Sequence, residues 1–151
     1  MPESFEQVET HAKSLHALIE DLIILSSLRS NQACLHDRIC DSGKRCAEIA
    51  AEQRAQSERR IILHRPIYPL FLQADCGRLC QVVTNLVHNA ILYSARQSII
   101  SLSIRAEDTR VVLQVHNEGN EIPQEQQARL FEPFYRTSLA ENRHRQEWDL
   151  A

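Results

Sequence analysis

The chain is organised around residues 78–94, which read RLCQVVTNLVHNAILYS. Apolar residues recur there at three- and four-residue steps, which predicts a helix with one buried face. The predicted buried set is Leu79, Val82, Val83, Leu86, Val87, Ala90 and Ile91. Asn85 and Asn89 lie four residues apart, so their amides stack one turn above the other. One alternative is that both asparagines are exposed or hydrogen-bonded locally. The other is that they form a binding site for a metal-bound polyphosphate, since Mg²⁺ accepts hard oxygen ligands.

Size and composition bound the class of protein. The 151 residues suffice for one ordinary domain plus an appended element. The hydrophobic content of 43% and charged content of 25% are typical of a soluble globular protein. A net charge of -3 does not indicate a nucleic-acid-binding protein. The apolar runs are too short to span a bilayer and no secretory signal precedes them, so we expect a cytoplasmic chain without a membrane segment.

The five cysteines suggest a reducing compartment, because their number is odd and no paired framework is visible. None has the Cys-x-x-Cys spacing of a zinc site. Cys34, Cys40 and Cys46 are predicted to lie on diverging faces of a helix, whereas Cys76 and Cys80 are close enough on one helix to touch. We expect these thiols to act as small buried hydrophobes.

The N-terminal part is predicted to be helical. Residues 5–29 carry a short seam of leucines at alternating three- and four-residue steps, formed by Leu15, Leu18, Leu22 and Leu25. This helix either packs on its own domain or is half of a helical hairpin that also pairs between subunits; the seam favours the hairpin. A second helix is predicted over residues 35–54, with Gly43 in its middle and Ile39 on its sparse apolar face.

The remaining pattern predicts strands and turns. Strands are expected at 61–63 and 68–73, and an antiparallel hairpin at 98–105 and 110–116. Asp75 is the expected N-cap of the central helix. A loop over 117–123 precedes a short helix over 124–130, and the polar tail 138–151 is expected to be disordered. The sum is a two-layer α/β sandwich with a helical arm.

Four motifs follow one another in a meaningful order: LIEDLIILSSLR at 18–29, ADCGRLCQVVTNLVHNAILYS at 74–94, NEGNEIP at 117–123 and LFEPFYR at 130–136. In this order they resemble the C-terminal part of sensor histidine kinases of two-component systems. The phrase FEPFYR is the more specific motif, because it separates histidine kinases from gyrase, MutL and chaperone relatives. The resemblance implies a second dimerisation-hairpin helix over 1–30 and a Bergerat-type ATP-binding catalytic domain over 33–151.

The resemblance also implies roles for single residues. Asn85 and Asn89 match the two asparagines of the N box, the first as Mg²⁺ ligand and the second as a phosphate and metal-shell contact. Tyr93 matches the aromatic residue that lines the ATP pocket. The further expected nucleotide-site residues are Asn117 in place of the adenine-reading aspartate, Gly119 and Ile122 of the first glycine box, and Phe131, Phe134 and Arg136 at the start of the lid.

Departures from the family pattern limit these expectations. Leu92 replaces the N-box lysine and Glu121 replaces the second glycine of the first box, so weaker ATP affinity is expected. No histidine lies in a His-Glu-x-x-x-Pro context, and the first hairpin helix with its phosphoacceptor is missing. His88 is expected to be a helix-surface residue.

The ending EWDLA stands about where the second glycine box should begin, which suggests a truncated domain. A one-base frameshift of a Gly-Met-Gly-Leu-Gly box would produce this ending.

The expected function is therefore the ATP-binding catalytic region of a sensor histidine kinase, which transfers a phosphoryl group from ATP to histidine. Whether this chain is itself an enzyme stays open, and alone it is not expected to autophosphorylate. The resemblance implies ATP and Mg²⁺ as cofactors. It implies a response regulator and a kinase dimerisation partner as protein partners, and the dimerisation partner includes a second copy of this chain in a homodimer. The alternative is a non-catalytic interaction module that pairs through its N-terminal helix.

Overall fold

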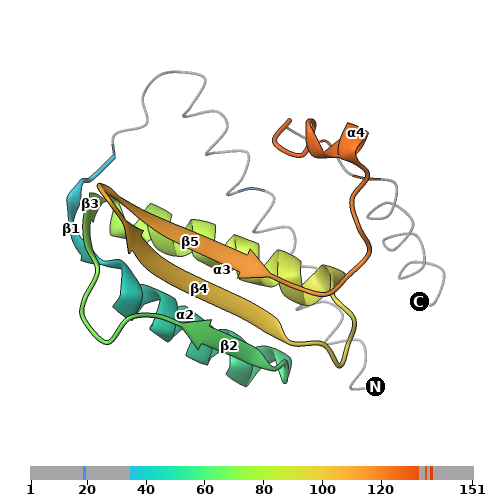
Figure 1. Cartoon of the computed structure of the whole chain (residues 1–151), viewed down its shortest axis with the longest axis horizontal. Helices are drawn as coiled ribbons and strands as arrows, with labels where there is room; N and C mark the ends of the chain where they lie inside the picture. The colour runs from blue at the N-terminus through green and yellow to red at the C-terminus, as the bar shows by residue number, and fades with distance from the viewer. Residues whose placement is uncertain (1–18, 20–34, 133–134, 136, 138–151) are drawn as a thin grey trace.

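The computed structural model describes residues 19, 35–132, 135 and 137 (Figure 1). The predicted helix over 5–29 and the predicted disordered tail therefore lie outside the described residues, except for Ile19. That residue is helical and about half exposed.

Two helices cover one face of a sheet, which confirms the predicted two-layer α/β sandwich (Figure 1). The three-stranded sheet has the order β2-β4-β5, with β2 parallel to β4 and β5 antiparallel to β4. A separate two-stranded ribbon pairs β1 with β3 in antiparallel fashion. In chain order the elements are β1 (Arg38–Asp41), α2 (Ser42–Ser57), β2 (Ile61–His64), β3 (Phe71–Ala74), α3 (Cys76–Tyr93), β4 (Ile100–Glu107), β5 (Arg110–His116) and α4 (Gln124–Gln127).

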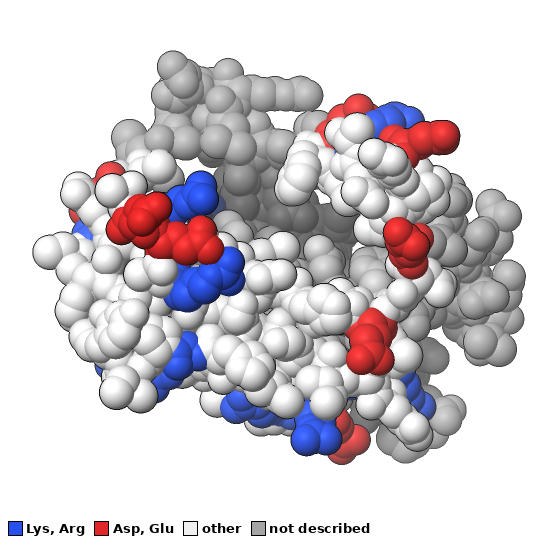
Figure 2. All heavy atoms as spheres, in the orientation of Figure 1, with Lys and Arg blue, Asp and Glu red and all other residues white. Residues whose placement is uncertain are grey.

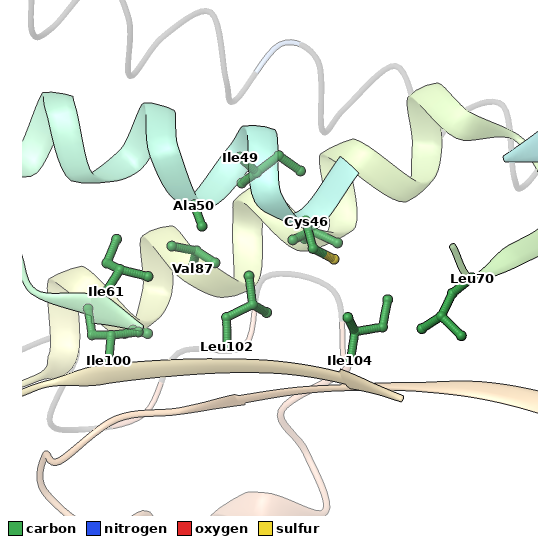
Figure 3. Packing of buried hydrophobic residues seen from close by; sticks show 11 residues of the cluster. Cys46, Ile49, Ala50, Ile61, Leu70, Val87, Ile100, Leu102 and Ile104 are labelled. Carbon is green, nitrogen blue, oxygen red and sulfur yellow. The ribbon is translucent and has the colours of Figure 1, made fainter. Parts of the chain in front are cut away.

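The core lies between the helices and the sheet (Figure 3). Strand β4 alternates with a period of two, so Ile100, Leu102 and Ile104 are buried while Ser101 and Ser103 between them are only half-buried. Helix α2 contributes Cys46, Ile49 and Ala50, and α3 contributes Val83, Val87 and Ala90. This packing fixes α3 against the sheet.

The prediction of a helix over 35–54 is wrong in its first third. Residues Arg38–Asp41 form β1, and α2 begins only at Ser42. Asp41 caps that helix by accepting a hydrogen bond from the Lys44 backbone N–H at 3.1 Å. Strand β1 pairs with β3, which begins thirty residues further along the chain. This pairing outweighs the local helical pattern of the sequence. Gly43 consequently lies in the first turn of α2, and Ile39 is exposed on a strand.

The central helix is confirmed, and it begins at Cys76, directly after the predicted N-cap Asp75. Its buried face is narrower than expected, because Val82 and Leu86 are 54% and 41% exposed. The β-hairpin is also confirmed, with a two-residue turn in which Asp108 has a positive φ of 48°. In the part of the chain that the structure describes, no helix has the length and apolar character needed to cross a bilayer.

Candidate functional site

Helix α3 presents Asn85, Asn89 and Tyr93 on one side at four-residue steps, and all three side chains are exposed. Because both asparagine amides reach water, neither carries the cost of an unsatisfied buried polar group. Their exposure also leaves their oxygen atoms accessible to a ligand. His88, between them, is exposed as expected.

The loop after β5 is docked against the C-terminal end of this helix. Gly119 forms a bridge with Ser94, and the Ala95 N–H donates a hydrogen bond to the Glu118 carbonyl at 2.9 Å. A Cβ atom placed on Gly119 would lie 2.3 Å from the Tyr93 carbonyl oxygen and 3.1 Å from Nδ2 of Asn117. Only glycine leaves room for this contact. The structure thus brings Asn117 and Gly119 of the loop together with Tyr93, which comes from a separate motif.

Arg59 also contacts this end of α3, and sequence reasoning missed this role. Its guanidinium donates hydrogen bonds to the Ala95 carbonyl at 2.6 Å, to the Ile91 carbonyl at 3.4 Å and to the hydroxyl of the buried Ser94. A cation near the last carbonyls of a helix also interacts favourably with the helix dipole. No local pattern identifies Arg59, because its partners lie more than thirty residues away.

Replacing Arg59 with alanine is expected to lower the free energy of unfolding by about 2 kcal/mol, because hydrogen bonds from a charged donor to the end of α3 are lost. Urea unfolding followed by circular dichroism measures this change. Arg60→Ala is the matched control, since Arg60 is the exposed neighbouring arginine. Equal destabilisation by the two substitutions would contradict the anchoring role.

The N-terminus of α3 is capped by Asp75, as the sequence predicts. Its carboxylate accepts hydrogen bonds from the backbone N–H groups of Gly77 at 3.0 Å and Arg78 at 3.1 Å. The backbone N–H of His36 donates to the same carboxylate at 3.1 Å. The hydrogen bond from Arg78, followed by that from His36, lowers the pKa of Asp75 below its usual value.

This lowered pKa gives a pH-dependent prediction. The stabilisation from ionised Asp75 is fully present above the unfolded-state pKa of about 4, and it is lost as the pH falls through the lower folded-state pKa. We therefore expect Asp75→Asn to melt at a lower temperature than the native chain at pH 7. The difference should shrink between pH 5 and pH 3 in thermal unfolding scans. A difference that is constant over this range would contradict the assignment.

The residues expected at the lid are only partly described. Ile122 is half-buried, and its carbonyl accepts a hydrogen bond from Nε2 of Gln127 at 2.8 Å. Phe131 is 98% exposed. Arg129 forms an ion pair with Glu132 at 3.0 Å and lies over the Tyr135 ring at 4.2 Å. Phe134 and Arg136 lie outside the described residues.

The side chains of the site are suited to a magnesium ion that is coordinated partly by a bound polyphosphate. They are less suited to a metal ion coordinated by protein side chains alone. Among the described residues, no three His, Cys, Asp or Glu side chains are placed to hold a metal ion. Mg²⁺ keeps several water ligands and takes the others from one or two protein oxygens and from substrate phosphates. The exposed Asn85 amide oxygen is a suitable ligand of this kind.

A separate depression of about 320 Å³ lies elsewhere, where the end of β2 meets β4. Its lining residues are His64, Arg65, Pro66, Tyr68, Ser103, Ile104, Arg105 and Ala106. None of them belongs to the motifs on α3 or on the loop after β5. On the face shown in Figure 2, acidic and basic side chains adjoin one another in a cluster left of the centre, and the described surface to the right of this cluster is largely uncharged.

Comparison with known proteins supports the resemblance to histidine kinases that the order of the motifs indicates. Residues 74–147 match the family described as histidine kinase-, DNA gyrase B-, and HSP90-like ATPase. The chain is 32% identical over 144 residues to the sensor histidine kinase YkoH of Bacillus subtilis, and 29% identical over 140 residues to the probable sensor histidine kinase TcrY of Mycobacterium tuberculosis. These matches cover 95% and 93% of this chain but only 31% and 30% of the relatives.

Solved structures show the same similarity. The histidine kinase AdeS of Acinetobacter baumannii matches with a TM-score of 0.71 and 25% identity, over 85% of this chain and 64% of that chain. The nucleotide-free catalytic domain of histidine kinase ThkA matches with a TM-score of 0.62 and 26% identity, over 69% of this chain and 73% of that domain.

Proposed function

From the premise that this chain contains the catalytic ATPase domain of a histidine kinase, we propose that it binds ATP with Mg²⁺ between α3 and the loop over 117–123. The domain would extend over residues 33–151, and residues 1–30 would be the second helix of a dimerisation hairpin. In a complete kinase this domain would serve phosphoryl transfer from ATP to histidine.

The close approach of Gly119 to Tyr93 is the observation that supports this proposal most strongly. It joins the two sequence motifs that the resemblance assigns to one nucleotide. Asn85 would bind Mg²⁺ through its amide oxygen, and Asn89 would contact a phosphate. The charge of the polyphosphate must be offset in such a site, and the bound Mg²⁺ supplies that electrostatic stabilisation.

The adenine end of the site would lie at the loop. Asn117 is half-buried beside Gly119, and its side-chain carbonyl would accept a hydrogen bond from the adenine amino group. Tyr93 and Ile122 would line the base. Phe131, Phe134 and Arg136 would anchor the lid that covers the nucleotide.

Isothermal titration calorimetry with Mg-ATP tests the proposal, with Mg-GTP as the control for base recognition. We expect saturable binding of ATP in the micromolar to millimolar range and weaker binding of GTP, which carries a carbonyl in place of the adenine amino group. A folded protein that binds neither nucleotide at millimolar concentration would contradict the proposal.

A non-catalytic interaction module is the second candidate function. The exposed position of Leu92, where the family has a lysine, favours it because one phosphate-binding cation is missing from α3. Its partner would be a response regulator or the dimerisation helix of a kinase, including a second copy of this chain. Size-exclusion chromatography with light scattering would detect the self-pairing that this candidate predicts.

A further inference from the structure

The segment that follows α3 is hydrogen-bonded to two other loops at the same end of the domain, where α2, α3 and β5 end (Figure 1). The carbonyl of Ala95 accepts a hydrogen bond from Nη2 of Arg59 at 2.6 Å, and the N–H of Ala95 donates one to the Glu118 carbonyl at 2.9 Å. Arg59 lies between α2 and β2, whereas Glu118 belongs to the loop over 117–123. Ala95 therefore links the side chain of Arg59 to that loop.

The guanidinium of Arg59 makes further contacts with the same segment. Nη2 also donates to the hydroxyl of the buried Ser94, and Nη1 donates to the Ile91 carbonyl at 3.4 Å. The backbone beside Arg59 is tied to the sheet, because the Arg60 carbonyl accepts a hydrogen bond from the Ile100 N–H at 3.0 Å. The side chain thus reaches the end of α3 from a backbone that the start of β4 holds in place.

Both terminal nitrogens of this side chain are needed for the contacts. Nε of Arg59 is buried, and within the described part of the chain it has no hydrogen-bond partner. An unpaired buried donor is unfavourable. The side chain nevertheless keeps the orientation in which Nη1 and Nη2 reach residues 91–95. Lysine has one ammonium group instead of this planar fork, so it cannot occupy both positions.

We propose that Arg59 is a positioning residue for the adenine end of the nucleotide site, and this inference rests on the function proposed above. Arg59 acts through Ala95 on the loop after β5 and not by contact with the base. Asn117 directly precedes Glu118, the residue that is hydrogen-bonded to Ala95. The side chain of Asn117, which is the expected acceptor for the adenine amino group, is therefore placed by a contact that Arg59 supports.

The phosphate end of the site does not share these contacts. Asn85 and Asn89 both precede Ile91, the first residue of α3 whose carbonyl Arg59 reaches. Their part of the helix is held against the sheet by core residues such as the fully buried Val87. Loss of the Arg59 side chain should therefore affect recognition of the base more than binding of the triphosphate. ATP and GTP share the triphosphate, so the ratio of their affinities reports the base alone.

Calorimetric titration with Mg-ATP and Mg-GTP tests this role in the native chain, in Arg59→Ala and Arg59→Lys, and in the control Arg60→Ala. We expect Arg59→Ala to weaken ATP binding about 10-fold and GTP binding by less, so that the preference for ATP is largely lost. Arg59→Lys should restore part of this preference, because it keeps a charged donor near the Ala95 carbonyl. Arg60→Ala should bind like the native chain. An ATP preference that Arg59→Ala leaves unchanged would overturn the proposal.

Amide hydrogen exchange tests the same role without nucleotide. We expect the Ala95 amide, which is bonded to Glu118, to exchange at least about 10-fold faster in Arg59→Ala, because the loop opens locally. The control is Ile49→Val, which lowers overall stability from within the core and should leave local opening at Ala95 unchanged. If Arg59→Ala does not fold, Arg59→Lys provides the same comparison.

The two measurements separate two kinds of failure. A native chain that binds neither nucleotide contradicts the proposed function. Exchange at Ala95 that does not respond to the Arg59 variants, or that responds equally to Ile49→Val, overturns the positioning role of Arg59 itself.

Discussion

Replacing Gly119 with alanine is expected to lower the free energy of unfolding by about 3 kcal/mol, the largest stability effect that we predict for an added methyl group. The new Cβ would lie 2.3 Å from the Tyr93 carbonyl oxygen, which is backbone and cannot rotate away. The loop would have to withdraw from α3 and open the bridge to Ser94. Because this movement separates Asn117 from Tyr93, nucleotide binding should weaken as well.

Gly77→Ala is the matched control for this prediction. A Cβ on Gly77 would have only the Asp75 carboxylate at 3.4 Å, which is an ordinary contact. Gly77 lies in the first turn of α3, where alanine has the higher helix propensity. We expect Gly77→Ala to be neutral or slightly stabilising in urea unfolding. If both glycines tolerate alanine equally, the tight contact between the loop and α3 is contradicted.

Replacing Asn85 with alanine is expected to weaken Mg-ATP binding by about 10- to 100-fold, because one protein ligand of the metal would be lost. The fold should not suffer. Asn85 is exposed, and alanine is the better helix former, so the Tm should stay the same or increase slightly. Weaker Mg-ATP binding by a variant with an undiminished Tm would therefore reflect the loss of a contact at the nucleotide site and not a loss of stability.

His88→Ala provides the comparison for Asn85→Ala. His88 is exposed on the same helix between the two asparagines, but it has no expected contact with the nucleotide. Both variants should be titrated with Mg-ATP under the same conditions. Equal affinity of the two variants would contradict the role of Asn85 as a metal ligand.

The elements that could be predicted from the sequence are those with strong local signals. Helix α3 shows a helical period and an Asp75 cap within one stretch, and the β4–β5 hairpin shows two β-branched runs around a short turn. Strand β1 could not be predicted, because its conformation depends on pairing with β3. Its residues also continue without a break into α2, so the local pattern extended the helix too far.

In the candidate site, too, residues with a local sequence signal could be predicted, whereas residues whose roles depend on long-range contacts could not. Asn85 and Asn89 were identified by their spacing on a predictable helix, and Gly119 by its motif. The reason that residue 119 is a glycine is visible only in three dimensions, as the contact with Tyr93. Arg59 was missed because its hydrogen bonds join segments that are far apart in the sequence.

Chemical-shift mapping with a non-hydrolysable Mg-ATP analogue tests the location of the site most directly. In ¹H–¹⁵N spectra of the full chain, we expect the largest perturbations at Asn85, Asn89 and Tyr93 of α3 and at Asn117 and Gly119 of the loop. Perturbations confined to the depression between β2 and β4, or the absence of any perturbation at millimolar nucleotide, would contradict the account.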